Sequence, residues 1–584
     1  MAFRPPLPAI LVVALLLSLP SVAIGFYSDD YVLRTEVAHT VPSAPPAYDL
    51  YDFTGATPAE NEARIASGTL PWWTSPGIRV HLLRPLASVL FALDVRVFGT
   101  APLGYHLVSI AWYLALVGLV GTLLGRLLPR GTGNLATLIF AIDQAHVFPW
   151  GWASCRHMTI AATFSVASLL CLVRAREKSW RAGHWLSALL QALALTGGET
   201  ALGGAAYALA YGVLGAPAQV PIRRRVALVA PMLAVTAVYL AVYAKAGAGA
   251  AHGGGYFSPL SEPDAFATAA ARRLPVMLAD ATLGVPADLS SVVPAGPFLV
   301  AAGLGCLGVF ALYRSTFPRV PPHARMALRW LVPGALLALL SVLGGFPGAR
   351  LRLLPDVGFA ALFGVLLWHG FVRVPQADGG AALWLRRALA GTFATIHLGL
   401  APLLALLNTG LNAQIARKLE EVASDVAAIA VPGDRVFVLA GSDPMVSIYP
   451  PAVLLAWSTA WTRSCWSMAS MAKGRQRFTR TGPSTVVIEP QGTTFLVGAF
   501  ETLFRSSDEP LRVGDLVSQC GAGYRVLDMR EGRPSEVELT LDVPLEDPHV
   551  HLLVWQEGHL RPMALPAVGD SLEIAWSPGP VGMF

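Results

Sequence analysis

Long apolar runs separated by short polar turns fill the first 410 residues of the chain. Runs of about 20 apolar residues are long enough to cross the hydrocarbon core of a bilayer as helices. A shorter apolar segment, 84–98, carries Asp94 and Arg96, and we expect it to form a helix in the membrane interface. The predicted fold class is therefore a polytopic α-helical membrane protein with about 11 transmembrane helices. The predicted spans cover residues 6–25, 102–126, 133–150, 157–173, 182–196, 199–215, 226–244, 294–313, 330–345, 353–372 and 388–408.

The amino-acid composition supports this interpretation. Of the 584 residues, 54% belong to the hydrophobic set and only 14% are charged, whereas soluble domains carry about 25% charged residues. This composition excludes an ordinary cytosolic enzyme, a disordered tail, a collagen-like fibre and a disulfide-framework mini-protein. The sequence also lacks a P-loop, an HExxH zinc motif and a CxxC pair, so we do not expect an ATP-driven pump.

Residues 411–584 differ from the rest of the chain because their charged residues are denser. They hold 14 of the 42 Lys and Arg residues and 20 of the 37 Asp and Glu residues. A helical pattern over 415–429 precedes a series of strand-like runs separated by Gly, Pro and Asp. We therefore expect a transmembrane domain over 1–410 and a C-terminal α/β or β-rich domain over 411–584. The predicted strands cover 435–440, 484–489, 524–528, 537–543, 550–555 and 571–576.

Lysine and arginine in the loops predict the orientation. With the N-terminus in the cytoplasm, the inside loops hold 17 basic residues but only Glu177 and Asp378 among the acidic ones. The C-terminal domain is then extracytoplasmic, as are two long loops, 26–83 and 245–293, which we expect to form partly ordered caps. The 17 basic residues are Arg4, Arg126, Arg130, Arg174, Arg176, Lys178, Arg181, Arg223, Arg224, Arg225, Arg314, Arg319, Arg325, Arg329, Arg373, Arg386 and Arg387.

This topology predicts an integral multi-pass protein of the bacterial inner or plasma membrane. We interpret the first run as an uncleaved span, although a cleaved signal peptide has a similar pattern. The basic residues are explained by their place in the inside loops, so membrane lipids, and not nucleic acid, are their expected partners.

Two adjacent carboxylates follow the first span, in the stretch Tyr27-Ser28-Asp29-Asp30-Tyr31. Neighbouring carboxylates repel each other and are costly to place beside a membrane. They are typical either of a solvated acidic turn or of a reactive site, where they act as a general base or as ligands of a divalent metal ion such as Mg²⁺ or Mn²⁺. We predict that Asp29 and Asp30 are catalytic and can hold such an ion.

Basic and imidazole side chains are predicted on the same outer face. Arginine offers a planar fork that suits phosphate oxygens, although it also snorkels to lipid headgroups. Glu199 opens a span from the outside, where it either complements the helix dipole or takes part in catalysis. The candidate substrate-binding residues are Arg84, His106, His146, Arg156, Arg350 and Arg352. Since the sequence has no nucleotide-binding motif, these candidate residues suit a donor that is already activated in the membrane, for example a lipid-linked sugar phosphate.

The order of these motifs resembles the GT-C superfamily of integral-membrane glycosyltransferases, in particular the branch of TMTC-type O-mannosyltransferases and related bacterial proteins. The resemblance implies a polyprenyl-phosphate sugar donor and an acidic motif, here Asp29-Asp30, that carries catalysis or metal binding. The resemblance also implies functional roles for Glu199, Arg350 and Arg352. The matching stretches are Tyr27–Tyr31, Arg84–Leu86, Phe91–Asp94 with Phe98-Gly99, Gly104–Val108, Phe140–Ile142 continuing to Arg156, Gly198–Thr200 and Arg350–Phe359.

Two functions remain open from the sequence. The first is transfer of a sugar from a polyprenyl-phosphate donor to a lipid, glycan or protein acceptor on the extracytoplasmic side. The second is a non-catalytic transporter or scaffold for lipid-linked glycans. Departures from the family pattern motivate this second hypothesis: Gly198 stands where the branch often has lysine, and Asp143-Gln144 stands where it has His-Pro.

Cysteine and tryptophan give two further interpretations. Cys465 and Cys520 share the oxidising outer compartment, where they either pair or stay as two buried free thiols. The tryptophans near the outer ends of the spans are interpreted as an aromatic belt at the membrane interface, with sugar stacking as the alternative. They are Trp72, Trp73, Trp150 and Trp152.

Overall fold

The computed structural model describes residues 6–39, 44–216, 219–371 and 380–582. The chain forms two compact units. The first comprises Met1–Ile24, Leu83–Gly247 and Glu262–Leu411, and the second comprises Gly25–Leu82, Ala248–Ser261 and Asn412–Phe584. The loop 26–83 thus belongs almost entirely to the same unit as the C-terminal residues, whereas the loop 245–293 is divided between the two units. Three residues of the predicted inside loops, Arg4, Arg373 and Asp378, lie outside the described residues.

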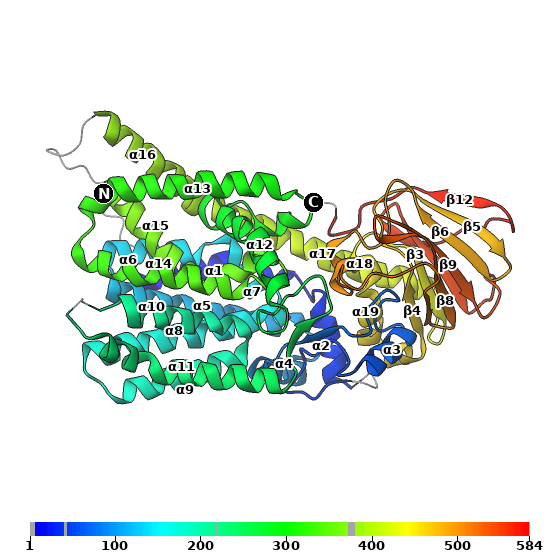
Figure 1. Ribbon diagram of the computed structural model, residues 1–584, viewed down its shortest axis with the longest axis horizontal. Helices are drawn as coiled ribbons and strands as arrows, with labels where there is room; N and C mark the ends of the chain where they lie inside the picture. Colours follow the sequence, from blue (N-terminus) through cyan, green and yellow to red (C-terminus); the bar gives the residue numbers. More distant parts are fainter. Residues whose placement is uncertain (1–5, 40–43, 217–218, 372–379, 583–584) are drawn as a thin grey trace. The chain divides into compact units, whose positions relative to one another are not determined.

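The first unit consists of apolar helices, many of which lie side by side (Figure 1). Helix α8 packs against both α5 and α9, and α10 packs against α14. The helices are α1 (Leu7–Ser18), α4 (Pro85–Phe98), α5 (Pro102–Leu127), α6 (Arg130–Ala141), α7 (Val147–Gly151), α8 (Arg156–Glu177), α9 (Ala182–Gly197), α10 (Leu202–Leu214), α11 (Ile222–Lys245), α12 (Pro263–Leu283), α13 (Ala295–Thr316), α14 (Pro322–Val342), α15 (Asp356–Gly370) and α16 (Gly380–Ala394). Helix α17 (Ala401–Ile429) follows a π-helical segment, Thr395–Leu400.

Six helical stretches among the described residues are long and apolar enough to cross a membrane. The mostly helical, membrane-type fold class is therefore confirmed, whereas the number of eleven spans stays a prediction. The six stretches are Pro102–Leu127, Ala153–Glu177, Ile222–Lys245, Ala295–Arg319, Pro322–Val342 and Gly380–Ile429. Two shorter apolar helices, Leu7–Ala23 and Asp356–Gly370, coincide with predicted spans.

Two predictions about this unit were wrong in detail. The predicted span 133–150 is not one helix, because α6 ends at Ala141 and short helical turns follow. The Asp143 side chain accepts a hydrogen bond from the backbone N–H of Ala145 at 2.9 Å, and this N-cap starts a new turn instead of continuing the helix. The predicted loop 245–293 contains the 21-residue helix α12, with Asp280 completely buried near its end.

The second unit contains two main sheets and a small β-ribbon. A four-stranded sheet has the order β11-β10-β3-β4, in which β3 is parallel to both β10 and β4. A six-stranded antiparallel sheet has the order β12-β5-β6-β9-β8-β7. The predicted α/β or β-rich domain is therefore confirmed. The strands are β1 (Arg79–His81), β2 (Gly249–Ala251), β3 (Arg435–Ala440), β4 (Cys465–Met468), β5 (Gln476–Gly482), β6 (Thr485–Pro490), β7 (Leu516–Gln519), β8 (Ala522–Arg530), β9 (Arg533–Leu541), β10 (Val550–Gln556), β11 (His559–Pro562) and β12 (Ser571–Ile574).

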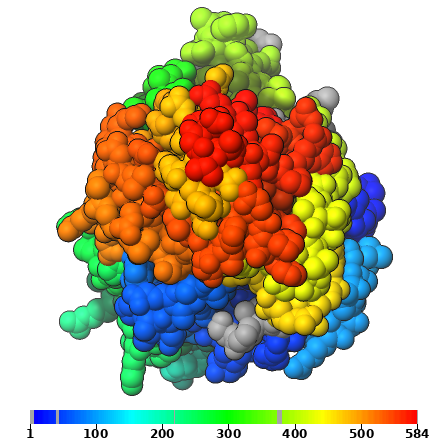
Figure 2. Space-filling model, turned by 90° about the vertical axis from the view of Figure 1, so that its right-hand side faces the viewer, coloured from blue at the N-terminus to red at the C-terminus, as the bar shows by residue number. Residues whose placement is uncertain are grey.

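Short helices complete the second unit: α2 (Asp29–Val37), α3 (Pro58–Ala66), α18 (Pro444–Ser447), α19 (Pro450–Trp457) and α20 (Ala499–Leu503). The segment around residues 50–80 (blue in Figure 2) lies against residues near 500–520 (orange). Trp72 is completely buried, stacks on Tyr524 with 5.0 Å between ring centroids, and donates a hydrogen bond to the carbonyl of Ala469. Trp73 is also buried and donates to the carbonyl of Glu501. These tryptophans belong to the core of the unit, so the aromatic-belt interpretation was wrong for both.

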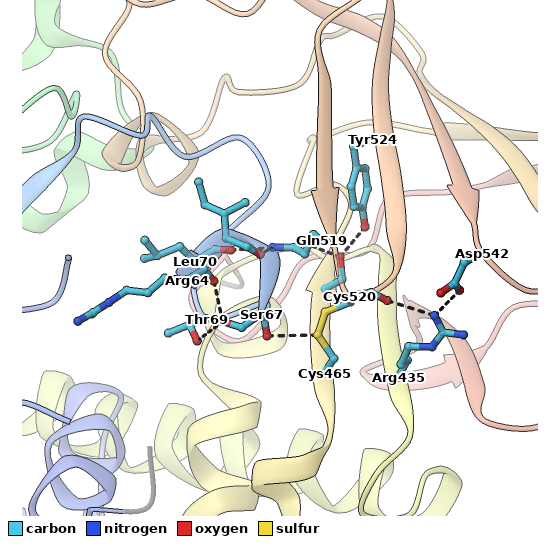
Figure 3. The surroundings of a disulfide bond; sticks show 12 residues. Arg64, Ser67, Thr69, Leu70, Arg435, Cys465, Gln519, Cys520, Tyr524 and Asp542 are labelled. Atoms are coloured by element: carbon cyan, nitrogen blue, oxygen red, sulfur yellow. Dashed lines mark hydrogen bonds and ion pairs between the residues drawn. A yellow bond between two sulfur atoms is a disulfide. The ribbon is translucent and has the colours of Figure 1, made fainter. Parts of the chain in front are cut away.

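A disulfide joins Cys465, at the start of β4, to Cys520, in the turn between β7 and β8 (Figure 3). Their Cα atoms lie 5.6 Å apart, inside the usual range for such a bond. The neighbouring Gln519 donates hydrogen bonds to the carbonyls of Ile65 and Leu70. The disulfide therefore fixes the point at which the 50–80 segment meets both sheets. Of the two alternatives that the sequence left open, the structure shows the paired cysteines.

We expect a non-reduced digest of the full-length protein to give a linked peptide containing Cys465 and Cys520. Replacing both by Ser removes the cross-link that restricts the conformations of the unfolded chain. This change should lower the free energy of unfolding of the second unit by about 2–4 kcal/mol, measured by thermal unfolding. The control is Cys306→Ser, an exposed free cysteine of the first unit, which should leave that transition unchanged. Recovery of Cys465 and Cys520 as free thiols would contradict the disulfide.

Candidate functional site

An ion pair in the first unit joins two predicted site residues. Arg84 precedes the first residue of α4, and Glu199 opens a short helical turn before α10. The Nε group of Arg84 donates to Oε2 of Glu199 at 2.9 Å, and both side chains are mostly buried. Glu199 thus holds the guanidinium of Arg84 in a fixed place.

A second arginine lies near the same group. The charges of both Arg84 and Arg350 act on the buried imidazole of His157, near the start of α8. Arg350 itself interacts with the carboxylate of Asp288, and the two groups meet around Gly348. The imidazole of His157 lies beside Gly198, which directly precedes Glu199. We call Arg84, His157 and Arg350 the basic cluster. His157 is absent from the predicted set, although it directly follows Arg156 in the sequence.

Arg352 lies in a different environment from Arg350. Its side chain is only 2% exposed and is surrounded by three carboxylates. It donates to Asp280 at 2.6 Å, to Asp143 at 2.8 Å, and to both oxygens of Asp356 at 3.1 and 3.2 Å. We call these four residues the Arg352 network. Since the guanidinium is satisfied by carboxylates, it has little capacity left for a phosphate.

His146 belongs to the edge of this network. Its Nε2 atom lies 3.3 Å from Asp356, and its Nδ1 atom lies 3.0 Å from the hydroxyl of Tyr113. Gln144 donates to Asp280 at 2.9 Å and accepts from Asn408 at 3.2 Å. The structure therefore brings the predicted residues His146 and Arg352 together, but it does so around carboxylates.

The remaining predicted residues of the first unit lie elsewhere in it. Arg156 is buried and forms a 2.5 Å ion pair with Asp94 of α4. His106 is buried on α5. The Arg156–Asp94 pair joins α8 to α4, a contact that explains why the short helix 84–98 packs against the longer helices.

Asp29 and Asp30 belong to the second unit, at the start of α2. Asp30 is completely buried, and its carboxylate accepts from the backbone N–H of Tyr27 at 3.0 Å, so it closes the turn. Asp29 is half-buried and accepts from the hydroxyl of Tyr449 at 2.8 Å. Burial, together with the Asp29 charge, raises the pKa of Tyr449 well above its usual value, which keeps this hydroxyl protonated as a donor. Asp29 is thus the carboxylate better placed to take a proton.

The backbone in front of this pair is unusual. Ser28 has φ +44°, in the left-handed region that non-glycine residues rarely adopt. Such a conformation costs about 1–3 kcal/mol and is often found at functional sites. On the other side of the pair, Tyr31 donates to Glu420 at 2.5 Å. The turn is therefore held by hydrogen bonds to residues far away in the sequence.

One group of metal-ligand type occurs among the described residues of the chain, and it is not Asp29-Asp30. Its ligand atoms, from Asp49, Asp52 and His81, lie within 4.8 Å of one another. However, Arg79 donates to Nδ1 of His81 at 2.7 Å. The other ring nitrogen must then carry the proton and donate to Asp49, at 2.9 Å. This tautomer does not fit a metal ligand, so the group is an ion-pair network as it stands, and we assign no reaction step to a metal ion.

A scan against protein-family models and a search of curated proteins found no match. Among solved structures, the chain is similar to the Archaeoglobus fulgidus oligosaccharyltransferase tethered with an acceptor peptide (11% identity, TM-score 0.37), covering 78% of this chain and 63% of that one. It is similar to ArnT from Cupriavidus metallidurans bound to undecaprenyl phosphate (15% identity, TM-score 0.37), covering 79% and 85%. It is also similar to the arabinofuranosyltransferase AftD from mycobacteria (14% identity, TM-score 0.37), covering 75% and 31%. The chain thus spans less than two thirds of the first and third proteins. Because these similarities are low, we base the function on the side chains described above.

Replacing Arg352 by Met should destabilise the first unit strongly. Three buried carboxylates would lose their cation, and removing one partner from a buried ion pair costs about 3–5 kcal/mol. The measurement is the midpoint of thermal unfolding in detergent. Arg96→Met, an exposed arginine on α4, is the matched control and should shift the midpoint little. A similar midpoint for both variants would show that the carboxylates do not depend on Arg352.

Proposed function

We propose that the protein is a membrane glycosyltransferase that moves a sugar from a polyprenyl-phosphate donor to an acceptor on the extracytoplasmic side of the membrane. One observation carries this proposal: the guanidinium of Arg84 is held at 2.9 Å by Glu199 within a unit of apolar helices. A lipid-linked phosphate has an apolar tail and an anionic head, which matches both features.

Arg84 and Arg350 are the proposed phosphate ligands. Their guanidinium forks stabilise the negative charge that grows on the phosphate as the bond to the sugar breaks. Glu199 and Asp288 act as positioning residues, because each interacts with one of the two arginines. Arg352 is left out of this site, since its donors are taken up by Asp143, Asp280 and Asp356.

Asp29 is the proposed general base. The oxygen of an acceptor hydroxyl attacks the anomeric carbon of the sugar, while the bond from that carbon to the phosphate oxygen breaks and leaves its electron pair on the phosphate. The hydroxyl proton passes to the carboxylate of Asp29. Tyr449 orients this carboxylate through its hydrogen bond. Asp30 holds the turn, so its effect on the reaction is indirect.

We expect Asp29→Asn to lower the turnover of the purified protein by about 10²–10⁴-fold, because general base catalysis is lost. The measurement is the release of free polyprenyl phosphate from a panel of polyprenyl-phosphate pentoses and hexoses, in the presence of membrane lipid and glycan acceptors. Tyr449→Phe should give a smaller decrease in kcat. Asp508→Asn, an exposed residue of the same unit, is the matched control. Full turnover by a folded Asp29→Asn variant would contradict the assignment.

Replacing Arg84 or Arg350 by Gln should raise KM for the donor by at least about tenfold, since a charge-assisted contact with phosphate contributes about 1.5–3 kcal/mol. Arg96→Gln is the control, because it leaves the charges of the basic cluster unchanged. The same assay of polyprenyl phosphate release tests the alternative function. A transporter or scaffold would bind the donor, but neither the wild type nor any variant would release polyprenyl phosphate.

A further inference from the structure

Residues 578–582 lie against the carboxyl end of β3 in the second unit. Strand β3 is parallel to both of its neighbours, β10 and β4, and residues 441–443 follow it at the edge of the sheet. In open parallel sheets, functional groups commonly lie at this carboxyl edge. We call residues 578–582 the 578–582 segment, and its contacts with the edge connect it to the candidate base.

Asp443 joins the 578–582 segment to α18. One carboxylate oxygen, Oδ1, accepts from the backbone N–H of Met445 at 2.9 Å and so caps the start of α18. The other oxygen, Oδ2, accepts from the backbone N–H groups of Val581 at 2.6 Å and Gly582 at 3.4 Å. The side chain is buried. Each oxygen therefore serves a different segment, and the carboxylate holds the two together.

The backbone of the 578–582 segment approaches this edge very closely at Gly579. A Cβ atom at Gly579 would lie 2.3 Å from Oγ of Ser442 and 2.4 Å from Oδ2 of Asp443. The neighbouring carbonyl, that of Pro578, accepts a hydrogen bond from the indole of the buried Trp555 in β10 at 3.0 Å. The segment is thus fixed at several points, and no side chain fits at position 579 without a displacement.

The short helix α18 continues this series of contacts to the candidate base. It begins directly after Asp443, and the backbone N–H of Tyr449 donates to the carbonyl of Pro444 at 3.1 Å. The hydroxyl of Tyr449 in turn donates to the carboxylate of Asp29 at 2.8 Å. The 578–582 segment, Asp443, α18, Tyr449 and Asp29 therefore form one continuous series of contacts within the second unit.

We propose that the 578–582 segment positions the carboxylate of Asp29, with Asp443 as the positioning residue. The segment holds Asp443, Asp443 holds the start of α18, and α18 sets the place of the Tyr449 hydroxyl. This inference rests on the proposed function, in which Asp29 takes the proton of the acceptor hydroxyl. A small displacement of a reacting group lowers the rate of the chemical step strongly, so the effect should appear in kcat. The basic cluster is not part of this series, so KM for the donor should stay the same.

Two variants of the full-length protein disturb the contact from opposite sides. Gly579→Ala places a methyl group against Ser442 and Asp443 without changing any charge, so the segment or the carboxylate must move. Asp443→Ser keeps a side-chain oxygen that can cap α18, but this side chain is too short to reach Val581. Gly482→Ala is the matched control, because a Cβ atom there would meet its nearest neighbour at 3.7 Å, an ordinary contact.

We expect Gly579→Ala and Asp443→Ser each to lower kcat by at least about fivefold, the size of effect that loss of one hydrogen bond to a charged group gives. KM for the donor should not change, and Gly482→Ala should behave as the wild type. The measurement is the release of polyprenyl phosphate. Gly579→Ala combined with Tyr449→Phe should be no slower than Tyr449→Phe alone, because the segment acts through the Tyr449 hydroxyl. A general loss of stability would instead multiply the two effects.

A second measurement does not depend on turnover. Hydrogen exchange of the backbone amides of residues 444–449, followed by mass spectrometry, should be at least about tenfold faster in Gly579→Ala than in the wild type. The proposal is overturned if Gly579→Ala keeps the wild-type kcat or the wild-type exchange rate, or if its effect multiplies with that of Tyr449→Phe. In each of these cases the proposed function stands if Asp29→Asn still lowers turnover. Full turnover by a folded Asp29→Asn variant would instead overturn the proposed function, and the positioning of a base with it.

Discussion

Charge compensation inside apolar helices is the constraint on which the first unit depends. Each buried carboxylate of this unit that we describe lies beside a guanidinium, as in the pairs Asp94–Arg156 and Glu199–Arg84. These pairs join segments far apart in the sequence, so they also decide which helices pack together. An ion pair of this kind adds little net stability by itself, because desolvation opposes the Coulomb attraction. The pair matters because an unpaired buried charge would destabilise the fold much more.

The same constraint gives the arginines of the first unit different surroundings. Arg84 is paired with Glu199, and Arg350 lies beside Asp288, so each of these guanidiniums faces one carboxylate. Arg352, in contrast, is surrounded by three carboxylates. Arg350 and Arg352 are two residues apart in the sequence, yet they serve these different sites. A short 3-10 turn, Ala349–Arg352, directs the two side chains to different carboxylate partners.

Hydrophobic periodicity predicted most of the helices and all six proposed strands, because burial of an apolar face depends on local pattern. It failed for α12, where Pro275 and Asp280 interrupt the apolar run; this helix is stabilised by tertiary contacts, including the pair with Arg352. For the site, the sequence identified Arg84, Glu199 and Arg350 as candidates, but it also grouped Arg352 with them as a phosphate ligand. Whether an arginine is available depends on which carboxylates meet it in the fold, and one sequence does not show this. A better signal was present in the lone aspartates within apolar runs, since such residues need a partner.

Two residues that depart from the family pattern make contacts inside the Arg352 network. Asp143-Gln144 replaces the His-Pro of the branch that the sequence resembles. Asp143 accepts from Arg352, and Gln144 donates to Asp280. A histidine at position 143 would bring a neutral or positive ring to the guanidinium, and a proline at 144 would remove the amide that bonds Asp280. Both residues thus contact the Arg352 network, Asp143 as an acceptor from Arg352 and Gln144 as a donor to Asp280.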